Sequence, residues 1–180
     1  MDQWIAVGTL FGVLVTAAIT DWKTGKIYNW LTIPAMVVGL VFWTAAGADG
    51  ALSSLGQSAL SLVVGFVPFA LIVALGGMGG GDAKLLGAVG ALCGDWRCVL
   101  ATAFYGFSLA ALFAVCVMVH RRLVVQTLSR LFTAVTFLYA RTRPEMPTDS
   151  LRIPMGIALC IGGILAGLEH LDVLRLPWSL

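Results

Sequence analysis

The stretch WIAVGTLFGVLVTAAIT, residues 4–20, carries no charged side chain and is long enough to cross a lipid bilayer as a helix. A membrane helix needs about 20 largely apolar residues, with a range of about 17–25. Further apolar runs follow along the chain, and the fourth of the segments is shorter than the others. Together they give six predicted membrane segments, at residues 4–20, 30–48, 55–77, 83–94, 98–119 and 153–168. The sequence therefore predicts an all-α, polytopic membrane protein.

The composition excludes most other classes of protein. Of the 180 residues, 59% are hydrophobic and 11% are charged, whereas a soluble domain has about 45–50% apolar and about 25% charged residues. The formal net charge of +2 is too small and too scattered to indicate binding to nucleic acid. We expect one membrane-embedded domain over residues 1–180 and no soluble domain.

The stretch that follows the fifth segment has a different pattern. Residues 120–142 begin with His120, Arg121 and Arg122 and then mix apolar with polar residues. This composition is typical of an amphipathic helix that lies on a membrane surface. We expect such a helix on the cytoplasmic side, before Pro144 and Pro147 end the helical region.

The basic residues indicate the orientation of the chain, because cytoplasmic loops of membrane proteins carry an excess of Lys and Arg. With six crossings, nine basic residues fall on one side of the membrane and only Arg97 and Arg175 fall on the other. We therefore expect the nine on the cytoplasmic side and both termini on the outer side.

The four cysteines lie in or beside apolar runs, and none forms a C-x-x-C pair. We expect Cys93, Cys98, Cys116 and Cys160 to be small buried hydrophobic residues. A bridge between Cys93 and Cys98 is the alternative if that pair faces an oxidising compartment. No cluster of His, Cys and carboxylates has the spacing of metal ligands, so neither a metal nor a cofactor is predicted.

Two acidic residues occupy unusual places. Asp21 directly follows the first apolar run, and Asp82 follows the glycine-rich stretch GGMGGG at residues 76–81. As a helix, residues 85–94 cover only about 15 Å of a bilayer core of about 30 Å. Either this helix starts further upstream, through Asp82, or the glycine loop dips into the bilayer. Both options bring the carboxylate of Asp82 below the membrane surface, where a charge is costly and indicates function.

Each of these residues also has a simpler interpretation. Asp82 could be the N-cap of the next helix after a flexible turn, and Asp21 could be a solvated charge beside Lys23 and Lys26. The functional interpretation pairs the two carboxylates on one side of the membrane, where they share a proton and act as base and acid on a water. The glycines would let the chain adopt positive φ and let another backbone approach closely.

Three motifs together resemble the type IV prepilin peptidases, which are aspartic endopeptidases of the GxGD class in the bacterial inner membrane. The motifs are Asp21 with KIYNWLT at residues 26–32, GGGDAKLL at residues 79–86, and RIPMG at residues 152–156. The resemblance implies that the domain is a peptidase whose catalytic pair is Asp21 and Asp82.

The same resemblance implies supporting roles for other motif residues. Gly79 and Gly81 would let the loop place Asp82 against Asp21, and Lys84 would orient the loop or hold anionic groups. Asn29 closes a motif in which the family commonly has Ile-Pro-Asn, whereas this chain has a tyrosine in the middle position, so the turn is less rigid.

One departure from the family identifies a branch within it. Long members carry a cysteine-rich cytoplasmic domain between the first segments, linked with N-methylation of the pilin, whereas residues 22–29 here contain no cysteine. The chain therefore resembles the short, peptidase-only branch that serves Flp-type (tight-adherence) pili, and methyltransferase activity is not implied. The implied reaction removes the short basic leader of a prepilin at the cytoplasmic face, with the prepilin and the bilayer as partners.

Two other functions use the same features. An ion-coupled transporter or channel subunit could carry Asp21 and Asp82 in an ion pathway, and a structural component of a pilus assembly is a third option. Inverted repeats or interrupted helices in matching halves would favour a transporter, but the chain has one glycine-rich break, at residues 76–81. A structural role gives no reason for two acidic residues beside membrane segments on one side.

Overall fold

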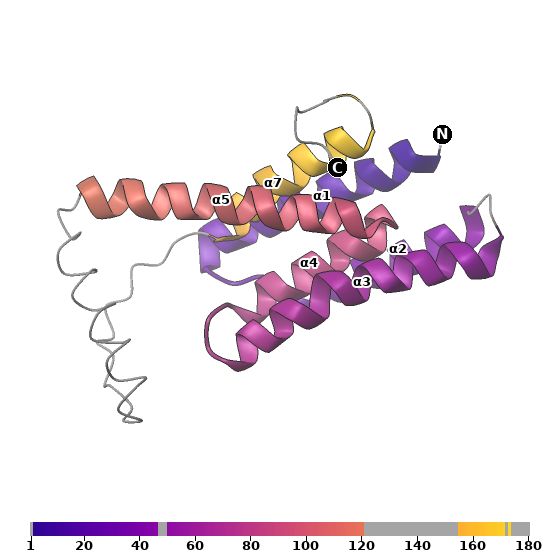
Figure 1. The fold of residues 1–180 in the computed structure, drawn as a ribbon, viewed down its shortest axis with the longest axis horizontal. Helices are drawn as coiled ribbons and strands as arrows, with labels where there is room; N and C mark the ends of the chain where they lie inside the picture. The colour runs from indigo at the N-terminus through magenta and orange to yellow at the C-terminus, as the bar shows by residue number, and fades with distance from the viewer. Residues whose placement is uncertain (1, 47–49, 121–154, 172, 174–180) are drawn as a thin grey trace. The chain divides into compact units, whose positions relative to one another are not determined.

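The computed structural model describes residues 2–46, 50–120, 155–171 and 173. These residues form the helices α1 (Asp2–Thr24), α2 (Asn29–Ala46), α3 (Ala51–Ala74), α4 (Gly80–Cys93), α5 (Trp96–His120) and α7 (Met155–His170), with no strand among them (Figure 1). The prediction of an all-α protein is confirmed. The surface helix expected at residues 120–142 lies outside the described residues except for His120, which ends α5.

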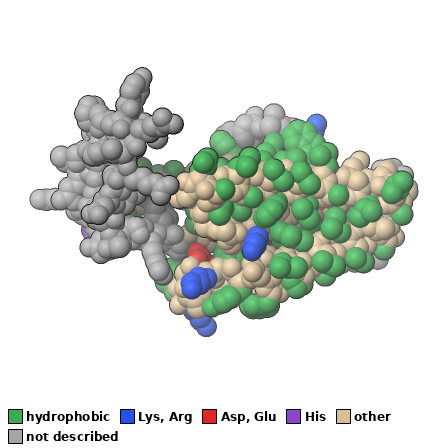
Figure 2. Space-filling model, turned by 90° about the horizontal axis from the view of Figure 1, so that it is seen from below, with side chains coloured by type: hydrophobic (Ala, Val, Ile, Leu, Met, Phe, Trp, Pro, Cys, Tyr) green, Lys and Arg blue, Asp and Glu red, His purple; other side chains and the backbone are tan. Residues whose placement is uncertain are grey.

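The helices have the length and composition of a multi-pass membrane protein. Four of them are long and apolar enough to cross a bilayer, over Trp4–Thr24, Asn29–Ala46, Ala51–Ala74 and Trp96–His120. α7 is a shorter apolar helix. Hydrophobic side chains are spread over the face seen in Figure 2, and charged side chains appear at only a few places on it. Such a surface suits a lipid environment, where large exposed side chains such as Val41 and Leu71 carry no penalty.

The contacts divide the chain into two compact units, residues 1–109 with 154–180 and residues 110–153. In the second unit the structure describes residues 110–120, which form the last part of α5. All the residues discussed below as a site belong to the first unit.

α4 is the central buried helix of the first unit, packed against α1, α2, α3 and α7 (Figure 1). Every residue from Leu85 to Cys93 is buried. Its 14 residues give a length of about 21 Å, shorter than the bilayer core. Because the helix begins at Gly80, it extends upstream through Asp82, which is the first of the two options that the sequence allowed.

Glycines let α4 pack with its backbone directly against its neighbours. A Cβ added to Gly90 would collide with the backbone at Ser61 of α3, and one added to Gly39 of α2 would collide with the backbone at Ala91. Two side chains form hydrogen bonds with the backbone near the C-terminal end of α4. Ser58 Oγ donates to the Ala91 carbonyl and Trp43 Nε1 donates to the Leu92 carbonyl, both at 2.9 Å. Any side chain at these glycines would separate the helices that hold α4 in place.

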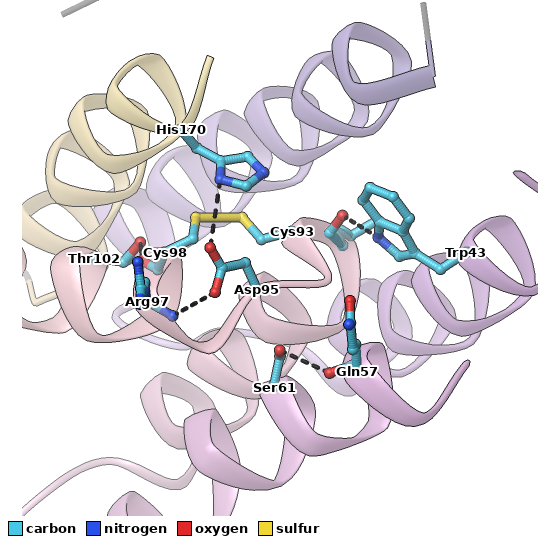
Figure 3. A network of polar contacts seen from close by, with 10 residues as sticks. Trp43, Gln57, Ser61, Cys93, Asp95, Arg97, Cys98, Thr102 and His170 are labelled. Atoms are coloured by element: carbon cyan, nitrogen blue, oxygen red, sulfur yellow. Dashed lines mark hydrogen bonds and ion pairs between the residues drawn. A yellow bond between two sulfur atoms is a disulfide. The ribbon is translucent and has the colours of Figure 1, made fainter. Parts of the chain in front are cut away.

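A network of polar contacts and a disulfide join α4, α5 and α7 beyond the end of α4 (Figure 3). Asp95 Oδ1 accepts a hydrogen bond from the Arg97 N–H at 3.0 Å, and its other oxygen lies 3.8 Å from His170 Nδ1. Cys93 and Cys98 are both buried and form a disulfide between the end of α4 and the start of α5.

The cysteine prediction needs two corrections. The bridge between Cys93 and Cys98, held as the alternative, replaces two free thiols. Cys160 is free and buried as expected, but Cys116 is free and exposed. An apolar residue on a membrane helix can face lipid, so its hydrophobicity alone does not require burial inside the protein.

Candidate active site

Asp21 lies in the last turn of α1, which ends at Thr24. The helix ends there because Gly25 adopts a positive φ of 64° and donates its N–H to the Asp21 carbonyl at 2.7 Å. The Asp21 side chain is half-buried, and its Oδ2 accepts a hydrogen bond from the Gly156 N–H at 2.8 Å. A residue of α7 therefore contacts the carboxylate at the end of α1.

Asp82 lies in the first turn of α4 and is also half-buried. The N-cap of this helix is Gly79, which has extended backbone and no side chain with which to cap, while Asp82 comes three residues later. The interpretation of Asp82 as an N-cap is therefore wrong. A negative charge in the first turn is favoured by the helix dipole, so this position tolerates an ionised carboxylate.

Glycines precede Asp82 mainly because other atoms approach their Cα atoms closely, and less because the backbone adopts an unusual conformation there. In the run at residues 76–81, only Gly76 has a positive φ, of 79°, so the expectation of left-handed backbone fails for Gly79 to Gly81. A Cβ on Gly79 would lie 2.9 Å from Asp82 Oδ2, and a Cβ on Gly81 would lie 2.9 Å from Ile27 Cβ. The missing side chains leave room for the carboxylate and for the connection between α1 and α2.

The structure brings Asp21 and Asp82 together, although they are distant in the sequence. α1 and α4 pack against each other, and the charge of Asp21 acts on Asp82. Burial, and after it the repulsion from Asp21, raises the pKa of Asp82 to about 6 from an ordinary value of 3.8. Asp82 precedes the buried part of α4 and lies outside the four long apolar helices.

Lys84 ties the start of α4 to the start of α2. Its Nζ donates a hydrogen bond to Oδ1 of Asn29 at 2.8 Å, and Asn29 is the first residue of α2. Both motif residues thus lie at the same end of the helices as the two carboxylates. The hydrogen bond is exposed, so it contributes little to the free energy of unfolding.

Gly156 makes a contact that the sequence does not predict. It belongs to the motif RIPMG, in which the sequence gives this glycine no separate role. The available signal is the proline two residues earlier, because a proline often precedes a helix whose first N–H groups have no partner within the helix. Nothing in the sequence indicates which carboxylate such an N–H would meet.

Two neighbouring carboxylates, one of which retains its proton at an elevated pH, can act as an acid–base pair. A pair of this kind can activate a water and protonate the group that the water attacks. The described residues contain no group of three or more His, Cys, Asp and Glu side chains that could hold a metal ion. The end of α1 and the start of α4 supply two carboxyl groups for such chemistry.

Comparison with known proteins identifies the family. A family model described as "Type IV leader peptidase family" matches residues 8–115, which is more than half of the chain and includes both Asp21 and Asp82. Comparisons with curated proteins and with solved structures give no match. By the extent of the family match, the chain belongs to the type IV leader peptidase family.

Proposed function

We propose that this protein is an aspartic endopeptidase of the GxGD type that removes the short basic leader of Flp-type prepilins, with Asp21 and Asp82 as its catalytic pair. The observation that carries the proposal is the meeting of these two carboxylates from α1 and α4. Membership of the type IV leader peptidase family supports the peptidase activity. A structural pilus component would not need the two carboxylates to act on each other.

In the proposed reaction the pair carries one proton. The ionised carboxylate takes a proton from a water, whose oxygen attacks the carbonyl carbon of the scissile peptide, while the other carboxyl group protonates the carbonyl oxygen. Collapse of the tetrahedral intermediate transfers a proton to the leaving nitrogen as the C–N bond breaks. One water is consumed for each peptide bond, and the pair again holds one proton.

The supporting residues have proposed roles in the same reaction. Gly79 and Gly81 allow Asp82 to approach Asp21, because a Cβ at either position would occupy space that neighbouring atoms already fill. Lys84 and Asn29 hold the starts of α4 and α2 together through their hydrogen bond. We propose no role for a metal or a cofactor.

The proposal is tested by producing the protein in bacterial cells together with a Flp-type prepilin. The expected result is a shorter pilin on a gel, with a new N-terminus at the start of its hydrophobic helix. Unprocessed prepilin in the presence of inserted wild-type protein would contradict the proposal, because this test supplies both enzyme and substrate in a membrane.

We further propose that the protein lies in the bacterial inner membrane with the carboxylate pair on the cytoplasmic side and both termini outside. The distribution of nine basic residues against two supports this orientation. A membrane-impermeant thiol reagent is expected to label a cysteine introduced at Gly50 from outside intact cells and one at Thr148 only after lysis. Labelling of both from the same side would contradict the topology.

The proposed pair also predicts how cleavage depends on pH. Because the pKa of Asp82 is raised to about 6, its proton is retained below that pH and is lost above it. Activity that needs this proton is therefore expected to fall as the pH rises through this range, and to fall again in strong acid when both carboxyl groups are protonated. The profile of kcat/KM against pH measures these changes in the free enzyme. The range from pH 4 to pH 8 covers about two units on either side of 6. A profile that is flat over this range would contradict the predicted pH dependence.

A further inference from the structure

The start of α7 supplies a backbone N–H to the carboxylate of Asp21. Gly156 is the second residue of α7, and its N–H donates to Asp21 Oδ2 at 2.8 Å. The first four N–H groups of a helix have no carbonyl partner within the helix. α7 packs along α1, so one of these free donors meets the last turn of α1.

Asp21 occupies a position where a negative charge needs such a partner. It lies in the last turn of α1, and the C-terminal end of a helix carries a partial negative charge that repels a carboxylate. The start of α7 carries the opposite partial charge. The N–H of Gly156 therefore offsets the unfavourable end of α1.

The fit at Gly156 leaves no room for a side chain. A Cβ at this position would lie 2.7 Å from Asp21 Oδ2 and 2.8 Å from Asp21 Cβ, closer than such atoms normally approach. Gly156 is buried, and its φ is not positive, so the glycine is required by the approach of Asp21 and not by its own backbone conformation.

The hydrogen bond from Gly156 favours the ionised form of Asp21 over the protonated form. An amide N–H only donates, and a hydrogen bond that it donates is stronger to a charged carboxylate than to a neutral carboxyl group, so the shared proton is favoured on the other member of the pair. We propose that Gly156 is a positioning residue that holds Asp21 as the proton acceptor, so that Asp82 is the proton donor. This proposal rests on the proposed aspartic mechanism. Asp21 then activates the water, and Asp82 protonates the carbonyl oxygen of the substrate.

The other charged groups near Asp21 agree with this assignment. α2, α4 and α7 pack against α1, and α2 has no titratable side chain. Besides Asp21 itself, the titratable side chains of α4, α7, the last turn of α1 and the turn after it are Lys23, Lys26, Tyr28, Asp82, Lys84, Cys160, Glu169 and His170. Glu169 and His170 lie at the far end of α7. Asp82 is the carboxyl group whose pKa rises through burial and the charge of Asp21, so the single proton is retained there.

The substitution Gly156→Ala tests the positioning role in the purified full-length protein. Loss of a hydrogen bond to a charged group, with displacement of Asp21, is expected to lower kcat by about 10- to 100-fold with little change in KM. The acidic limb of the kcat/KM profile, which belongs to the pair as a unit, is expected to move to higher pH, because the ionised pair has lost a hydrogen-bond donor. An unchanged kcat and an unchanged acidic limb would overturn the proposal.

Gly162→Ala is the matched control on the same helix. A Cβ at Gly162 would lie 2.8 Å from Gly106 Cα of α5, so this variant also crowds the packing of α7 but does not touch Asp21. It is expected to lower the thermal stability and to keep the wild-type acidic limb. If both variants shifted the acidic limb equally, the effect of Gly156 would be one of packing and the positioning role would be wrong.

A second measurement on the wild-type protein does not depend on the folding of any variant. Dicyclohexylcarbodiimide modifies protonated carboxyl groups, and the modified residue can be identified by mass spectrometry of peptides. At a pH just below that at which Asp82 loses its proton, the expected product carries the label on Asp82, with Asp21 unlabelled. Preferential labelling of Asp21 would overturn the assignment.

These outcomes separate the inference from the proposed function. If the wild-type protein cleaves a synthetic prepilin and needs both carboxylates, the peptidase proposal stands whatever Gly156→Ala does. Cleavage that needs both carboxylates, combined with labelling on Asp21 and a wild-type pH profile in Gly156→Ala, would overturn the role of Gly156 alone.

Discussion

Replacing Asp21 or Asp82 by asparagine is expected to abolish peptide cleavage while the protein still inserts into the membrane. Asparagine has nearly the size of aspartate, and its amide oxygen at position 21 can still accept the Gly156 N–H. It can neither take a proton from water nor return one to the substrate. We expect each variant to lose about 10⁴-fold in kcat/KM, measured with purified protein and a synthetic prepilin peptide.

The double variant and a control make this prediction specific. Because the two carboxylates act as one unit, Asp21→Asn combined with Asp82→Asn is expected to lose little more than either single variant. Asp95→Asn carries the same substitution at the other end of α4, where Asp95 accepts a hydrogen bond from the Arg97 N–H, and is expected to leave cleavage near the wild-type rate. Single variants that keep a tenth of the activity would show that the pair is not catalytic.

The second large effect is expected at Gly81. A Cβ there would lie 2.9 Å from Ile27 Cβ and 3.0 Å from the Ile27 carbonyl oxygen, so Gly81→Ala pushes the start of α4 away from the turn after α1. This shift moves Asp82 relative to Asp21. Misplacement of a catalytic group by about 1 Å can cost about 100-fold in rate, and we expect a loss of that size in kcat.

Gly80→Ala is the matched control, one position earlier in the same helix. A Cβ at Gly80 would meet only Val73 Cγ1, at an ordinary contact distance of 3.8 Å. Alanine also favours the helix more than glycine does, so Gly80→Ala is expected to keep its activity and its thermal stability. Equal activity of the two variants would show that the close approach at Gly81 does not position Asp82.

The long helices of this protein could be predicted because their apolar runs reach the length of a bilayer crossing. Their ends could not be read from hydropathy alone. α1 continues past the apolar run at residues 4–20 to Thr24, where Gly25 turns the chain. α4 begins before the apolar stretch at residues 85–94 and includes the charged Asp82 and Lys84. The ends depend on glycine caps and on packing, and neither has a hydropathy signal.

The pairing of Asp21 with Asp82 could be proposed from residue type and sidedness, but its geometry could not. It depends on how closely α1 and α4 approach, and glycine contacts such as that of Gly81 with Ile27 decide this distance. The contact of the Gly156 N–H could not be predicted from the sequence for a simpler reason. A backbone donor has no residue type, so its role emerges only when the start of α7 is placed beside Asp21.

The most direct test of the proposed activity is mass spectrometry of a synthetic prepilin after incubation with the purified protein in detergent. The wild-type protein is expected to give two fragments from one cut between the basic leader and the hydrophobic helix, and Asp82→Asn is expected to leave the peptide intact. An intact peptide after incubation with folded wild-type protein, or the same two fragments after incubation with Asp82→Asn, would contradict an aspartic peptidase built on this pair.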